Sequence, residues 1–148
     1  MNEIFKLIGV VIKNSQVIEY NMALAMGLHR VTSEFDERKK IPLTEYRQIE
    51  KDAVKLRESM SQKTLGQVIE EISDTNCLKP KQLNKLKTVL EDRNYIVHQI
   101  FKDEFEPDPE EKEKIKTYLI EVINNMSRAN QSLSSTIESL KEKYDSIK

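Results

Sequence analysis

The chain has 148 residues, of which 24 are Lys or Arg and 25 are Asp or Glu, so its net charge is −1. Three Gly and four Pro leave few residues for the tight turns of a many-stranded sheet. Hydrophobic residues make up 38% and charged residues 33%, a balance that suits long helices with wide polar faces. We predict one all-α domain over residues 1–148, and the near-neutral charge argues against a general nucleic-acid binder.

Residue counts also disfavour several kinds of site. The single cysteine, Cys77, cannot form an intramolecular disulfide and fits a reducing compartment. Two histidines, His29 and His98, do not favour a multi-histidine centre, so we expect no metal and no cofactor. The longest apolar run, Leu7 to Ile12, is far shorter than the roughly 20 residues of a membrane span, and the chain start lacks a signal-peptide cleavage pattern. We expect a soluble, cytoplasmic protein.

The first predicted helix covers about residues 2–34. Its apolar positions recur at alternating steps of four and three, at Ile4, Ile8, Val11, Ser15, Ile18, Met22, Ala25 and His29. Glu19 falls inside an apolar arc formed by Ile8, Ile12, Ile18, Met22 and Met26. Because an isolated buried charge is costly, Glu19 needs a partner if it is buried.

Three shorter helices are predicted next, over about 43–61, 64–75 and 80–102. Each has apolar residues spaced by threes and fours, and Pro80 stands where proline is tolerated, in a first helical turn. Residues 103–113 hold seven acids against one lysine, with Pro107 and Pro109. We read this segment as a loop that leads into a helix start, where carboxylates suit the positive end of the helix dipole.

The last predicted helix covers about 109–146 and would be about 55 Å long, beyond the size of a compact domain. We therefore predict an antiparallel bundle of four to five helices with a long C-terminal helix. Its second half, about 127–148, would protrude as a dimerisation segment, with a second copy of the chain burying Leu133, Ile137 and Leu140.

The helix over 80–102 carries Arg93-Asn94-Tyr95-Ile96-Val97-His98, a choice of residues that core packing does not explain. Arg93 projects near the centre of the apolar arc, formed by Leu86, Val89, Leu90, Val97, Ile100 and Phe101. Asn94 and His98 lie one turn apart on the edge of that arc. An Arg93–Glu19 ion pair between two helices would explain the buried arginine, and such a pair is compatible with a functional role.

The surrounding segment is basic. Residues 79–102 hold six Lys or Arg against Glu91 and Asp92, a local charge of +4. A positive strip beside a histidine suits a phosphate-bearing substrate, which Lys85, Lys87 and Lys102 would contact. The alternative is an ordinary charged face in contact with solvent.

The segment Arg93 to His98 resembles the Arg-X4-His signature of HEPN domains, in the form where a polar Asn follows the Arg. The stretch Thr64-Leu65-Gly66-Gln67-Val68-Ile69, followed by a lysine-rich helix, is similar to one bacterial branch of that family. The resemblance covers residues 64 to 105. It implies a helical bundle that dimerises so that the two motif helices border a shared cleft.

Many members of this family are metal-independent endoribonucleases, often toxins of toxin–antitoxin or anti-phage systems. The resemblance implies that the RNA 2′-OH attacks the adjacent phosphate, with His98 as acid or base and Arg93 on the phosphate. Since one histidine cannot easily be both acid and base, a homodimer supplies two. Asn94 would orient His98 or contact a phosphate oxygen, and Glu19 would support Arg93. An antitoxin protein is a further expected partner.

Two other readings remain open at this stage. One is a non-catalytic HEPN module that binds RNA, nucleotide or a partner protein, and the other is a structural helical protein with a coiled-coil contact. In some members a tyrosine two places after the histidine is adenylylated; Ile100 occupies that position here, which argues against this control. Tyr95 projects away from the apolar arc and need not be catalytic.

Overall fold

The computed structural model describes residues 2–36, 64–98 and 107–147, together with 47–48, 51, 54–55 and 58–59. Within these ranges the fold is all-α, with α1 (Asn2–Asp36), α3 (Leu65–Asp74), α4 (Pro80–His98) and α5 (Pro109–Ile147). The residues described between 47 and 59 are helical, and the rest of the helix predicted over 43–61 lies outside the described residues.

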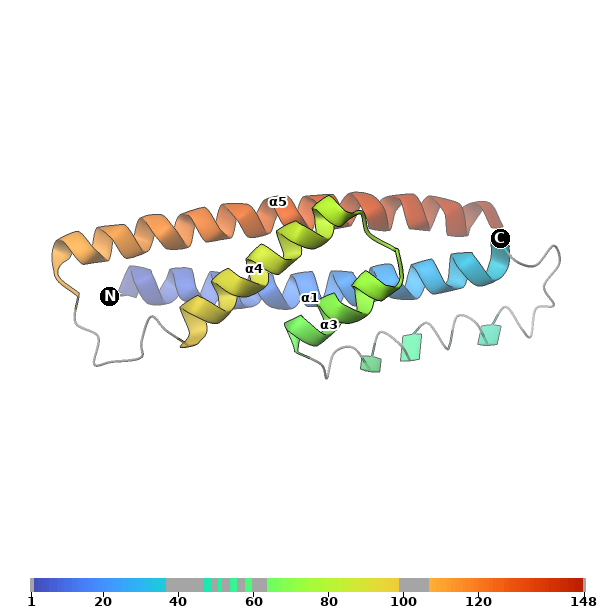
Figure 1. The fold of residues 1–148 in the computed structure, drawn as a ribbon, viewed down its shortest axis with the longest axis horizontal. Helices are drawn as coiled ribbons and strands as arrows, with labels where there is room; N and C mark the ends of the chain where they lie inside the picture. The colour runs from blue at the N-terminus through green and yellow to red at the C-terminus, as the bar shows by residue number, and fades with distance from the viewer. Residues whose placement is uncertain are drawn as a thin grey trace.

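The two long helices form the body of the molecule. With 39 residues α5 is about 58 Å long, and the 35-residue α1 lies along it (Figure 1). Lys116 Nζ contacts Glu3 Oε2 at 2.7 Å near one end of the pair, and Asn21 Nδ2 donates to Asn130 Oδ1 at 2.8 Å farther along. From the first contact to the second, the residue numbers increase on both helices, so α1 and α5 run parallel.

This orientation corrects part of the predicted antiparallel bundle. The antiparallel arrangement holds for α4 and α5, which are neighbours in the chain, since Gln82 contacts Ser132 whereas Asp92 contacts Tyr118. It does not hold for α1 and α5. In Figure 1, α3 and α4 lie together across one side of the long pair, and α4 returns the chain to the end where α5 begins.

Local sequence explains where the helices begin. Thr64 caps α3, because its hydroxyl accepts from Gln67 N at 3.2 Å while Gln67 Oε1 accepts from Thr64 N at 2.9 Å. Asp108 Oδ1 accepts from Glu111 N at 2.8 Å, directly before Pro109 begins α5. The predicted helix start at 109 is therefore confirmed, with Glu110 and Glu111 in its first turn.

The core follows the predicted stripes closely. Most predicted apolar positions of α1, α3 and α5 are buried in one cluster, which includes Ile4, Val11, Ile18, Met22, Leu65, Val68, Ile69, Ile72, Leu119, Val122, Met126 and Ala129. Two residues expected in buried arcs, Ile12 of α1 and Val97 of α4, are instead 38% exposed. None of the described helices contains a stretch long and apolar enough to cross a bilayer.

Contrary to the prediction, Leu133, Ile137 and Leu140 need no second copy of the chain to cover them. Leu133 is 1% exposed and Ile137 is 5% exposed within the single chain, and Leu140 packs against the same cluster. The prediction compared the length of α5 with the diameter of a compact domain. However, α1 is nearly as long as α5 and lies beside it over most of its length. The chain itself therefore covers these side chains.

Candidate functional site

Helix α4 carries the Arg93–His98 segment at its C-terminal end. Lys79 precedes the helix, and its backbone N donates to Gln82 Oε1 at 2.9 Å, so Gln82 satisfies one of the free donors at this helix start. Leu86, Val89 and Ile96 anchor one face of α4 in the core. This packing determines which residues of the segment point inward and which contact solvent.

Arg93 lies half-buried on the inner side of α4. Its Nη1 donates to Asn94 Oδ1 at 3.2 Å, whereas its Nε is buried and has no hydrogen-bond partner. An unsatisfied buried donor costs about 1–3 kcal/mol. The guanidinium therefore has one buried N–H donor, at Nε, that no acceptor satisfies.

Glu19 of α1 lies near Arg93, as predicted from the two helical patterns. Burial raises the pKa of the Glu19 carboxyl above its usual value, and the positive charge of Arg93 acts in the opposite direction. The structure shows no direct salt bridge between these two described residues. The predicted ion pair is thus replaced by a longer-range interaction, in which burial has the larger effect on Glu19.

His98 is the last described residue of α4, and its side chain is exposed. Asn94, one helical turn before it, is also exposed. Arg93 and His98 are five residues apart, so they project about 140° apart around the helix axis. Within one chain the guanidinium faces α1 while the imidazole faces solvent, and the two do not converge on one point.

Of the three lysines predicted to contact phosphate, two lie on different sides of α4 and the third lies outside the described residues. Lys85 and Lys87 are both exposed on α4. Lys87 lies on the same side of the helix as Asn94, seven residues later, whereas Lys85 faces the side where α5 packs. Lys102, Ile100 and Phe101 lie outside the described residues.

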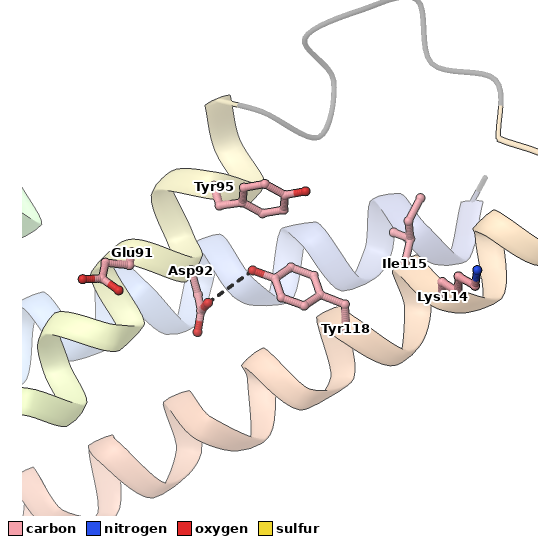
Figure 2. A pocket seen from close by; sticks show the side chains of 6 residues that line it. All are labelled: Glu91, Asp92, Tyr95, Lys114, Ile115 and Tyr118. Carbon is pink, nitrogen blue, oxygen red and sulfur yellow. Dashed lines mark hydrogen bonds between the residues drawn. The ribbon is translucent and has the colours of Figure 1, made fainter.

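Sequence reasoning missed an aromatic and acidic pocket between α4 and α5 (Figure 2). It has a volume of about 520 Å³, and its walls are Glu91, Asp92, Tyr95, Lys114, Ile115 and Tyr118. The rings of Tyr95 and Tyr118 meet edge to face, with centroids 5.7 Å apart and an angle of 87° between their planes. The outward projection of Tyr95 was visible in the sequence, but its pairing with Tyr118 depends on how α5 packs.

The phenol of Tyr118 is tied to this pocket by a hydrogen bond. Its hydroxyl donates to Asp92 Oδ1 at 3.2 Å, the dashed line in Figure 2. Burial, reinforced by the negative charge of Asp92, raises the pKa of Tyr118 to about 12. Tyr118 therefore stays protonated at neutral pH and acts as a donor that orients Asp92.

The cysteine of the chain, Cys77, is a partly buried free thiol. Burial raises the pKa of the Cys77 thiol to about 11, so little of the reactive thiolate forms at neutral pH. Across the described ranges no three His, Cys, Asp or Glu side chains gather closely enough to hold a metal ion. Searches with the chain found no matching family model, no matching curated protein and no matching solved structure.

Proposed function

We propose that the protein is a metal-independent endoribonuclease of the HEPN type. The observation that carries the proposal is the solvent-exposed imidazole of His98 at the end of α4, one turn from the exposed Asn94. The preceding residue, Arg93, is held by that same Asn94 through Nη1. An imidazole, a guanidinium and an amide thus lie within the last two turns of one helix.

The chemistry follows from these groups if two chains associate. One His98 takes the proton from the RNA 2′-OH, and the O2′ atom attacks the adjacent phosphorus. The bond from phosphorus to O5′ breaks, and the second His98 gives its proton to the departing O5′. The products are a 2′,3′-cyclic phosphate and a free 5′-OH, while Arg93 stabilises the charge that develops on the phosphoryl oxygens.

A homodimer is part of this proposal because one chain is incomplete. A single His98 cannot serve as base and acid in the same step, and Arg93 of the same chain projects away from it. Two α4 helices related by a two-fold axis would bring two imidazoles to one cleft. We infer a toxin–antitoxin or anti-phage setting from the family resemblance, with an antitoxin protein as a further partner.

The second candidate is an RNA-binding module that does not cut. The specific observation in its favour is that Arg93 is half-buried, with Nε enclosed and its charge directed toward Glu19. Such an arginine reaches a scissile phosphate only if its side chain turns outward. Binding without cleavage would need no such movement.

The test is cleavage of single-stranded RNA by the purified chain in the presence of EDTA. We expect 2′,3′-cyclic phosphate ends, and we expect His98→Ala to lower the rate by at least about 10²-fold without changing the helical content by circular dichroism. His29→Ala, which removes the other histidine, is the matched control and should retain cleavage. RNA bound but not cut would support the module, and neither binding nor cutting would favour a structural helical protein.

A further inference from the structure

We call the pocket around Tyr95 and Tyr118 the tyrosine pocket. A second hollow between α4 and α5 is lined by positive instead of mainly negative side chains. It has a volume of about 440 Å³. Four residues of α4 and two of α5 form its walls: Lys81, Asn84, Lys85, Thr88, Asn125 and Arg128. We call these six residues the cationic groove.

The cationic groove contains three positive charges and no carboxylate. Arg128 Nη1 donates to Asn125 Oδ1 at 3.4 Å, a contact between two of the groove residues. None of Lys81, Lys85 and Arg128 makes a salt bridge with another described residue, and all three side chains are exposed. In a chain of net charge −1, three cations around a hollow whose lining holds no carboxylate favour the binding of an anion there.

The spacing of these cations suits a polyanion better than a single small anion. Lys81 and Lys85 are one turn apart on the same side of α4, about 6 Å along its axis. Arg128 approaches from the opposite wall, on α5. The three cations therefore line the groove from both sides, an arrangement that follows a backbone of successive phosphates.

The groove also has a defined end. Farther along α4 the same two helices enclose the tyrosine pocket, where Glu91 and Asp92 bring negative charge. A phosphate backbone is attracted to the Lys81 end and repelled at the Glu91 end. Lys85 lies 13 residues before His98, about 20 Å along the helix, so the groove is a separate surface from the Arg93–His98 segment.

We propose that the cationic groove binds the phosphate backbone of single-stranded RNA, at a distance from the Arg93–His98 segment. This inference rests on the proposed function for the identity of the polyanion. It adds a binding surface that includes α5, through Arg128 and Asn125, whereas the basic strip read from the sequence involved α4 alone. It also separates Lys85, which lines the groove, from Lys87, which does not.

The experiment measures RNA affinity in the full-length His98→Ala protein, which prevents cutting during the measurement. A fluorescent single-stranded RNA oligonucleotide is titrated at several salt concentrations, and anisotropy reports binding. The groove variant is Lys81→Gln, Lys85→Gln and Arg128→Gln together. The matched control is Lys6→Gln, Lys13→Gln and Lys141→Gln, which removes three exposed cations elsewhere.

We expect the groove variant to bind RNA at least about tenfold more weakly, with the slope of log K against log salt smaller by about 2. The control should stay close to the parent, and both variants should melt as the parent does. Equal weakening in groove variant and control, unchanged affinity in the groove variant, or no RNA binding by the parent would each overturn the proposal. Competition by a free nucleotide as effective as RNA would overturn it too, in favour of a small phosphate ligand.

This outcome is separable from that of the proposed function. Cleavage is measured on the same oligonucleotide with the chain that retains His98. Groove-dependent binding without any cleavage would support the groove and contradict the nuclease. Cleavage that depends on His98 while RNA affinity ignores the groove would support the nuclease and contradict the groove.

Discussion

At Glu19, burial and charge act on the same carboxyl group in opposite directions. Burial disfavours the carboxylate and raises its pKa, and Arg93 favours the carboxylate through its positive charge. Because burial has the larger effect, the folded chain holds a proton on Glu19 more tightly than the unfolded chain does. The carboxylate at neutral pH is therefore a source of instability rather than of stability.

The pH dependence of stability follows from this sign. A carboxyl whose pKa is raised by folding contributes its stability below the unfolded value and loses it as the pH rises through the folded value. We expect Glu19→Gln to raise the free energy of unfolding at pH 7. The gain should shrink as the pH falls below the ordinary glutamate value, as measured by urea unfolding at a series of pH values.

Glu121→Gln is the matched control, because Glu121 is an exposed acid on α5. Its effect on the free energy of unfolding should be small. A loss of stability in Glu19→Gln at pH 7 would contradict the prediction. It would show that the carboxylate holds Arg93 in a stabilising ion pair.

For Arg93 and Tyr95, the helical pattern predicted which way the side chains point but not which atoms they contact. The position of Arg93 near the centre of an apolar arc predicted both its burial and its proximity to Glu19. The pattern could not predict that Arg93 Nε lacks a hydrogen-bond partner, because this depends on rotamers and on atomic distances between two helices. Likewise, the pattern placed Tyr95 away from the core, and only the packing of α5 brought Tyr118 beside it.

Among the elements, the start of α4 is held in place by one side chain. Gln82 Oε1 caps the helix at Lys79, while Nε2 donates to Thr136 Oγ1 at 2.8 Å, Ser132 Oγ at 3.0 Å and Ser132 O at 3.1 Å. Gln82 thus joins a local helix cap to a contact with α5. The same contact sets the register of the groove and pocket walls farther along α4.

We expect Gln82→Ala to lower the free energy of unfolding by about 1–3 kcal/mol, because it leaves partly buried polar groups unsatisfied. Gln67→Ala is the matched control, since Gln67 has the same capping position on α3 but makes only the local bond. The control should cost about 0.5 kcal/mol. Urea unfolding followed by circular dichroism measures both, and equal losses would contradict the link to α5.

The two long helices, α1 and α5, form a parallel pair that α3 and α4 cross. Each long helix protects the other, so apolar residues far beyond a compact core remain buried. The proposed dimer therefore does not need the C-terminal half of α5 for burial. The contact proposed for it lies instead where two α4 helices would approach each other.

We expect Leu133→Ala to lower the free energy of unfolding by about 2–5 kcal/mol, because Leu133 is buried within the chain. Its molecular mass in solution, measured by light scattering, should equal that of the wild type. Ile120→Ala, at a residue that is 49% exposed, should change stability by about 0.5 kcal/mol or less. A Leu133→Ala chain that dissociates without losing stability would instead place Leu133 at a subunit contact.

The all-α class, the starts of the described helices and the buried faces of α1, α3 and α5 follow from the amino-acid pattern alone, because they depend on periodicity and capping between near neighbours in the chain. Three features required the packed structure: the parallel course of α1 and α5, the burial of Leu133 within the chain, and the two hollows that α5 completes beside α4. Helical periodicity states which face of a helix is buried but not which helix covers it. Helix direction and the walls of a groove depend on contacts between residues far apart in the chain, such as Gln82 with Ser132 and Tyr95 with Tyr118.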